Sequence, residues 1–100
     1  MKNQNQKIKF QDWNCLLEFG EYQNNGRTAI TLIDENDGSP ITTATINLPN
    51  VSLNDDEVII KDYSENEGIL NILLINGVVE LTGKSVDTGF VNCEICKLIK

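Results

Sequence analysis

The side chains that could support catalysis or hold a metal ion are few in this sequence. Its 100 residues include three cysteines and no histidine, which removes the commonest general base and every Ser–His or Cys–His nucleophile pair. Cys93 and Cys96 have the C-x-x-C spacing of redox and zinc sites, but the surrounding residues predict a strand, in which the two side chains point to opposite faces. A zinc site would need two further ligands, and Cys15 is the one cysteine left. We therefore expect three buried cysteines that act as apolar residues, with neither a metal site nor a cofactor.

A second candidate is the acidic stretch at residues 34–38, Asp-Glu-Asn-Asp-Gly. An EF-hand calcium loop needs glycine at its sixth position and a glutamate at its twelfth. When Asp34 is taken as the first position, Gly38 is the fifth and Thr45 is the twelfth. The stretch therefore predicts the turn of a β-hairpin, because Asp-Gly is a common hairpin turn.

Polar and acidic side chains are densest at residues 62–68, Asp-Tyr-Ser-Glu-Asn-Glu-Gly. Ser64 and Glu67 have the spacing of a capping box, in which each side chain bonds the backbone N–H of the other residue. This predicts a helix over about residues 65–76 that ends at Gly77. Gly68, in the first turn of that helix, would cost up to about 1 kcal/mol relative to alanine. We therefore expect a close approach to its backbone, either by the sheet of this chain or by a partner.

The carboxylates of this segment complement the dipole of the predicted helix and would repel a phosphate, which argues against a nucleotide site there. They allow contact with a basic partner. Large aromatic side chains often anchor protein interfaces, and Tyr63 lies in the segment, whereas Trp13 follows a turn, precedes a strand and is expected in the core. The predicted partner-binding residues are Tyr63, Glu65, Asn66 and Glu67.

The predicted helix is apolar in most directions. Only Asn71 interrupts the apolar run from Ile69 to Ile75, although a surface helix needs an apolar arc of little more than about 100°. Two arrangements remain open. The helix is packed on the sheet and covered by a loop, or it offers its outer face to another chain, which includes a second copy of this one.

Composition excludes several classes of function. The formal net charge is −7 and only eight residues are Lys or Arg, so direct binding to nucleic acid or to an anionic membrane is disfavoured. No apolar run approaches the roughly 20 residues of a membrane span, and the polar N-terminal residues lack the apolar segment of a signal peptide. We expect a cytoplasmic protein whose acidic surface serves solubility or a basic protein partner.

Apolar alternation and turn residues predict one α+β domain over residues 7–100, after a disordered tail at residues 1–6. Pro49 is expected to end the third strand, and residues 83–89 are expected to connect the last two strands. The predicted fold is a mostly antiparallel sheet of five or six strands with the one helix packed on it. The predicted strands cover residues 15–22, 28–33, 41–48, 57–61, 79–82 and 90–99, and residues 7–10 are a candidate for a further short strand.

Residues 61–68, Lys-Asp-Tyr-Ser-Glu-Asn-Glu-Gly, carry the most specific part of a family resemblance. Together with residues 43–49, 77–79 and 88–91, they resemble a family of small proteins of unknown function that are encoded on phages, plasmids and integrative elements of gut bacteria. The resemblance covers the chain from residue 28 to residue 99. It implies no activity and no catalytic residue. It does imply a genomic context in which small accessory proteins often bind and block host proteins.

The sequence therefore favours a non-enzymatic, small acidic binding protein of a mobile genetic element, which blocks a host defence or regulatory protein through residues 62–68. One alternative is a dimeric protein that sequesters a nucleotide-like small ligand in a cavity between subunits, lined by Trp13, Tyr22 or Tyr63 and a few basic groups. Another is a structural accessory protein with no discrete site. No nucleophile or acid–base constellation supports an enzyme.

Overall fold

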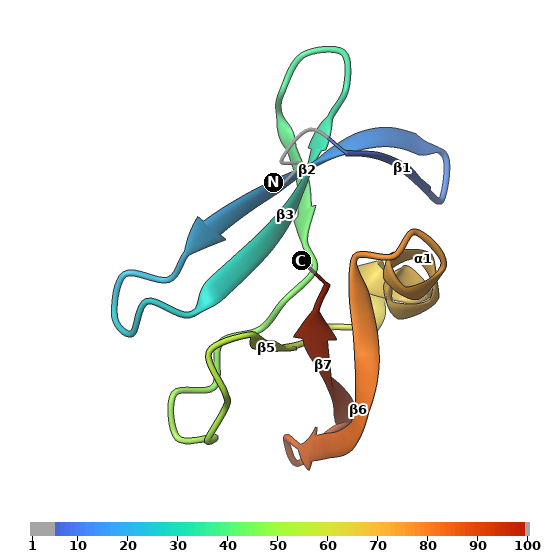
Figure 1. Cartoon of the computed structure of the whole chain (residues 1–100). Helices are drawn as coiled ribbons and strands as arrows, with labels where there is room; N and C mark the ends of the chain where they lie inside the picture. Colours follow the sequence, from blue (N-terminus) through green and yellow to red (C-terminus); the bar gives the residue numbers. More distant parts are fainter. Residues whose placement is uncertain (1–5, 100) are drawn as a thin grey trace.

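Figure 1 shows the computed structural model, which describes residues 6–99. The seven strands in this part of the chain form two antiparallel sheets, the first with the order β1-β2-β3-β4 and the second with the order β5-β7-β6. The predicted α+β class with antiparallel strands is confirmed, whereas the single sheet of five or six strands is wrong. The strands are β1 (Lys7–Phe10), β2 (Trp13–Glu21), β3 (Thr28–Asp34), β4 (Pro40–Thr43), β5 (Glu57–Ile59), β6 (Val79–Asp87) and β7 (Asn92–Leu98).

The acidic stretch at residues 34–38 forms the turn between β3 and β4. The Asp34 N–H donates to the Ser39 carbonyl at 2.7 Å, and the Gly38 N–H donates to the Asp34 carbonyl at 2.8 Å. Gly38 has a φ of +76°, which glycine adopts without strain. The prediction of a hairpin turn is therefore confirmed.

The predicted tail falls mainly on residues 1–5, which lie outside the described residues. Gln6, its last residue, is held by the fold. Its carbonyl accepts the Leu17 N–H at 3.0 Å, and its side-chain amide donates to the Asn76 carbonyl at 2.9 Å. The hydrogen-bonded part of the described chain therefore begins at Gln6, one residue before the predicted boundary of the domain.

The strand predicted over residues 41–48 is wrong in its second half, because the chain changes sheet there. β4 ends at Thr43, and Thr45 forms an isolated antiparallel bridge with Ile60, directly after β5. Ala44 and Thr45 are both buried, although successive side chains of a regular strand point to opposite faces. Two buried neighbours fit a chain that passes between two sheets. This crossover divides the strands into two sheets.

The helical segment is shorter than predicted and starts without a capping box. A single 3₁₀ turn, η1 (Ser64–Asn66), precedes the helix α1 (Ile69–Ile75), which has seven residues. Ser64 has a φ of +55°, and its side chain makes no capping bond. The carboxylate of Asp62 takes that role, because it accepts the Gly68 N–H at 2.8 Å.

Gly68 separates η1 from α1 through its backbone conformation. Its φ is +96°, in the left-handed region that costs other residues roughly 1–2 kcal/mol. A Cβ at this position would meet no atom within 4 Å beyond its chain neighbours, so the expected close approach to its backbone is wrong. The predicted end of the helix is confirmed: Gly77 has a φ of +69°, and its N–H donates to the Leu74 carbonyl at 3.2 Å, as in a Schellman motif.

The main core lies between the two sheets and α1, which sits beside β6 and below β1 in Figure 1. Ile69 and Leu73 of α1 are fully buried, whereas Ile75 is 71% exposed. One side of the helix therefore packs, and its outer side is not covered at Ile75. No helix of the described residues is long and apolar enough to cross a membrane. Further core residues are Ile8, Phe10, Leu17, Ile30, Leu32, Val58, Ile60 and Val79.

The second sheet is apolar on both of its faces. Cys96 of β7 belongs to the main core, whereas Cys93 and Ile95 join Ile59 in a second cluster on the opposite side. We call this opposite side the outer face. Apolar side chains from residues 46–53 pack against it. The outer face is therefore covered by a loop rather than by another sheet or a helix.

The connection between the last two strands is shorter than the predicted residues 83–89. β6 continues to Asp87 through a bulge between Leu81 and Lys84, where Gly83 has a φ of +83°. Residues 88–91 make the turn. A bulge and a lysine on an edge strand are features that discourage pairing with another chain.

Candidate binding surface

The segment at residues 62–68 leaves only part of its polar surface free for a partner. The carboxylate of Asp62 is engaged at the start of α1. Glu65 is exposed, and its Oε2 lies 2.9 Å from the Lys61 Nζ. Glu67 is exposed as well, and Tyr63 is half-buried. Three of the four predicted partner-binding residues are therefore accessible.

Asn66 is the fourth, and it is fully buried. Its Nδ2 donates to the Thr43 carbonyl at 2.8 Å, and its Oδ1 accepts from the Thr42 hydroxyl. Because β4 is an edge of the first sheet, this amide ties η1 to that edge and satisfies polar groups that would otherwise be unpaired. Asn66 therefore does not belong to the accessible surface, contrary to the prediction.

Lys61 and Glu65 form an ion pair beside Tyr63. The hydrogen bond from Lys61 lowers the pKa of Glu65, and the same bond raises the pKa of Lys61. The Lys61 Nζ lies 5.7 Å from the centre of the Tyr63 ring, within the range of a cation–π contact. Because the carboxylate is exposed, the pair fixes the position of the ammonium group more than it stabilises the fold.

An open groove of ≈ 450 Å³ lies beside this pair. Residues of the first sheet and of the crossover form one wall, and the segment after β5 forms the other. The Tyr22 hydroxyl lies 2.9 Å from the Thr45 Oγ1, so that part of the wall is held in place. The lining includes Tyr22, Thr42, Thr45, Asn47, Tyr63 and Glu65.

A second groove of ≈ 270 Å³ is lined by Phe10, Trp13, Ile41 and Glu65. Trp13 is 46% exposed, so its expected place in the core is wrong. The Gln11 side chain donates to the Glu65 carbonyl at 3.2 Å and thereby joins the β1–β2 turn to η1. Glu65 lines both grooves. Its exposed carboxylate therefore lies between two grooves that aromatic side chains line.

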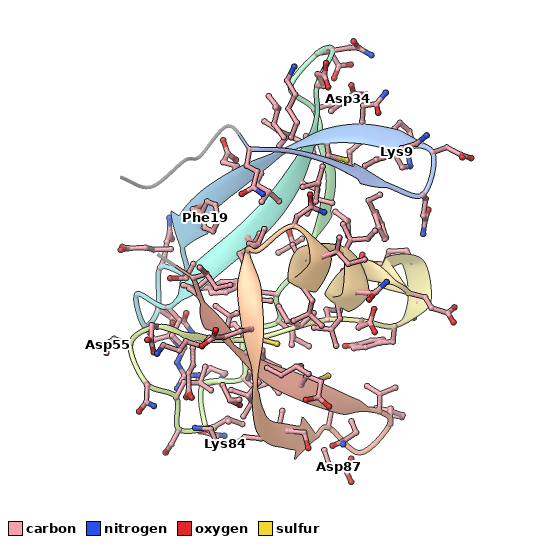
Figure 2. All side chains as sticks on the ribbon, turned by 45° about the vertical axis from the view of Figure 1, so that its right-hand side comes forward. Lys9, Phe19, Asp34, Asp55, Lys84 and Asp87 are labelled. Atoms are coloured by element: carbon pink, nitrogen blue, oxygen red, sulfur yellow. The ribbon has the colours of Figure 1, made fainter. Side chains whose placement is uncertain are left out.

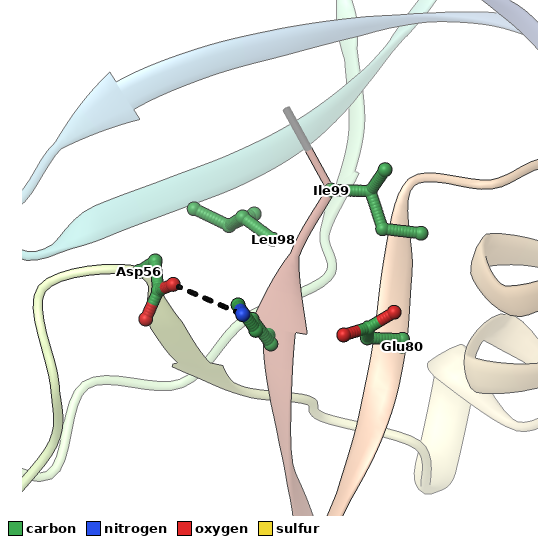
Figure 3. Close-up of a pocket in the computed structure, with 5 residues that line it drawn as sticks. Asp56, Glu80, Leu98 and Ile99 are labelled. Carbon is green, nitrogen blue, oxygen red and sulfur yellow. Dashed lines mark ion pairs between the residues drawn. The ribbon is translucent and has the colours of Figure 1, made fainter.

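Figure 3 shows a third groove, at the end of β7. Its cation is Lys97, whose Nζ lies 3.9 Å from the Asp56 carboxylate, and Glu80 lies on its other side. Leu98 and Ile99 complete the lining. None of the described residues that line it is aromatic, so this groove has fewer of the features of a binding surface.

The three cysteines are buried, as predicted. Burial raises the pKa of all three thiols, that of Cys96 to about 11. Because the thiolate is the reactive form, these side chains are poor nucleophiles at neutral pH. Cys93 and Cys96 lie on opposite faces of β7, which confirms that prediction. Among residues 6–99, no group of three or more His, Cys, Asp or Glu side chains is placed to hold a metal ion.

Phe90 is not among the predicted site residues, yet it is 94% exposed. The predicted strand begins at Phe90, whereas β7 begins at Asn92 and Phe90 lies in the turn before it. Gly89, directly before it, has a φ of +97°. A large aromatic residue directly after Thr-Gly, a pair that favours a turn, is the signal from which its exposure could have been predicted.

Comparison with known protein families, with curated proteins and with solved structures gave no significant match for this chain. The resemblance to small proteins of mobile elements therefore stays a prediction.

Proposed function

We propose that this chain is a non-enzymatic binding protein of a mobile genetic element and that it blocks a host protein. The contact surface is centred on Tyr63, Glu65 and Glu67, and it extends to Trp13 on one side and Tyr22 on the other. That the partner is a host protein is inferred from the genomic context that the family resemblance implies.

The observation that carries this proposal is the position of Glu65 between two aromatic-lined grooves. Exposed aromatic side chains supply much of the binding energy of protein interfaces. An exposed carboxylate between them, on a chain with a net charge of −7, favours a partner with a basic surface.

The test is affinity capture from host lysate with the tagged wild-type chain and the variant Tyr63→Ala/Glu67→Lys. Glu65 is left unchanged because a lysine there would face Lys61. The matched control is Ile75→Ala/Glu18→Lys, which also truncates one apolar residue and reverses one exposed charge, but away from the grooves. Thermal unfolding first establishes that all three proteins are folded.

A host protein that the wild type and the control retain, and that the variant loses, supports the proposal. Equal retention by all three contradicts the assigned surface. Capture of no host protein contradicts the function.

A second candidate function is the sequestration of a small ligand by a dimer. It is favoured by the groove that Tyr22 and Tyr63 line together with Lys61, since these are the aromatic and basic groups expected for such a site. The groove is open in one chain, and a second copy would have to close it. Native mass spectrometry of the purified protein tests this: a dimer that carries a small molecule supports sequestration, and a ligand-free monomer contradicts it.

A further inference from the structure

Phe90 has the most exposed large apolar side chain of the described residues, at 94%. A phenylalanine with almost all of its surface in water contributes nothing by burial to the fold. The aromatic ring therefore does not stabilise the fold by packing. It lies in the turn of the β6–β7 hairpin.

The turn that carries Phe90 is held by several hydrogen bonds. The Thr88 N–H donates to the Val91 carbonyl at 2.9 Å, and the Thr88 hydroxyl donates to the same carbonyl at 3.1 Å. The Asp87 carboxylate accepts the Gly89 N–H at 2.8 Å. A residue on a turn that is already ordered loses less conformational entropy on binding, which favours it as an anchor.

Phe90 directly precedes a residue that packs on the outer face of the second sheet. Its neighbour Val91 packs against the buried cluster of that face together with Val86 and Tyr63, and all three stay partly exposed. Tyr63 also lines the groove beside Glu65. Val91, the residue after Phe90, therefore shares one apolar cluster with Tyr63 of the candidate binding surface.

The net charge of the chain favours a basic occupant, since the two lysines beside this surface are each paired with a glutamate. Lys84 of β6 is paired with Glu57 at 2.8 Å, and Lys61 is paired with Glu65. Figure 2 shows Lys84 and Asp87 at the same end of the molecule, and Asp87 belongs to the hairpin end that carries Phe90. With a net charge of −7 on each chain, two copies would repel one another, whereas a partner with a positive surface would be attracted.

We propose that Phe90 is an anchor residue that inserts into an apolar pocket of a basic protein, and that this contact continues over Val86 and Val91 to Tyr63. The inference rests on the proposed function and deepens it, because it names the chemistry of the partner and a second contact point.

The experiment replaces Phe90, Tyr63 or Ile75 with a photo-reactive phenylalanine analogue and irradiates each full-length protein in host lysate. Ile75 is the control, because it is also apolar and 71% exposed but lies on α1. We expect positions 90 and 63 to crosslink to the same protein, at peptides rich in Lys or Arg, and position 75 to give no such product.

The crosslinked protein is then purified and titrated with the wild type, Phe90→Ala and Ile75→Ala. An anchor residue predicts a loss of affinity of roughly 30-fold or more for Phe90→Ala and no change for Ile75→Ala. Phe90→Ala is expected to unfold at the wild-type temperature, since its side chain is not buried.

Three results would overturn the inference. If position 63 crosslinks and position 90 does not, the proposed function stands and the Phe90 contact fails. If neither position crosslinks, both fail. If position 90 crosslinks to a second copy of this chain, or to an acidic peptide, the occupant is not a basic protein.

Discussion

At the scale of a single residue, the buried side chain of Asn66 stabilises the segment that carries the candidate surface. Its amide bonds the Thr43 carbonyl and the Thr42 hydroxyl, and removal of one partner from a buried hydrogen bond costs about 1–3 kcal/mol. We expect Asn66→Ala to lower the urea concentration at the midpoint of unfolding, and the exposed neighbour Glu67→Ala to leave it unchanged. Equal midpoints for wild type and Asn66→Ala would show that the amide makes no net contribution.

Gly68 stabilises the same segment through its φ of +96°. A Cβ has room there, so Gly68→Ala tests backbone strain alone, and we expect it to lower the free energy of unfolding by about 1–2 kcal/mol. Gly20 in β2 is the control: a Cβ has room there too, and the backbone is not left-handed. Gly20→Ala is expected to be neutral or stabilising, because alanine restricts the unfolded chain. Urea unfolding of both variants measures the difference, and equal losses would contradict this account of Gly68.

At the scale of elements, Glu57 joins the two edge strands of the second sheet. Its side chain is 5% exposed at the start of β5, and its Oε2 lies 2.8 Å from the Nζ of Lys84 on β6. Its Oε1 accepts the Asn54 N–H at 2.9 Å. The hydrogen bond from the Asn54 backbone, followed by that from Lys84, lowers the pKa of Glu57 below its ordinary value of 4.5.

This lowered pKa predicts how stability depends on pH. A carboxylate with a lower pKa in the folded state contributes stability above its unfolded pKa, and this contribution is lost as the pH falls through the folded pKa. From about pH 5 downward, we expect the free energy of unfolding to fall more steeply for the wild type than for Glu57→Gln. Urea unfolding at a series of pH values measures both slopes, with Glu18→Gln as an exposed control. Parallel curves for wild type and Glu57→Gln would contradict the role of Glu57.

Elements with local signals were predicted well, and those that depend on distant residues were not. The first strand, Lys7–Phe10, and the helix end at Gly77 follow from alternation and from glycine geometry, which short segments determine. The change of sheet after Thr43 depends on pairing with Ile60, which no local pattern contains. The predicted start of α1 is wrong because the spacing of a capping box also fits a 3₁₀ turn followed by a left-handed glycine.

At the scale of the whole molecule, the candidate surface is a product of tertiary structure. The sequence located residues 62–68 but could not place Tyr22 beside Tyr63 or Trp13 near Glu65, because these residues come from different sheets or turns. It also could not distinguish the buried Asn66 from its exposed neighbours, since both kinds of residue are polar. Asn66 is buried because its segment lies against the edge strand β4.

Arg27 connects the first sheet to the loop that covers the outer face of the second. It lies in the turn between β2 and β3, and its guanidinium donates to the Leu48 carbonyl at 2.9 Å and to the Val51 carbonyl. These two carbonyls belong to the loop at residues 46–53, which covers the outer face. A planar guanidinium can hold two acceptors in fixed directions, which an ammonium group cannot.

Loss of Arg27 should therefore loosen the cover of the second sheet without unfolding the first. We expect Arg27→Lys to speed hydrogen exchange at residues 46–53 and to increase binding of a hydrophobic dye, while the amides of β2 and β3 exchange at wild-type rates. Lys9→Arg, which exchanges the same two cations at an exposed position of β1, is the matched control. Unchanged exchange at residues 46–53 would show that apolar packing alone holds the loop, and faster exchange throughout would show that Arg27 supports the whole domain.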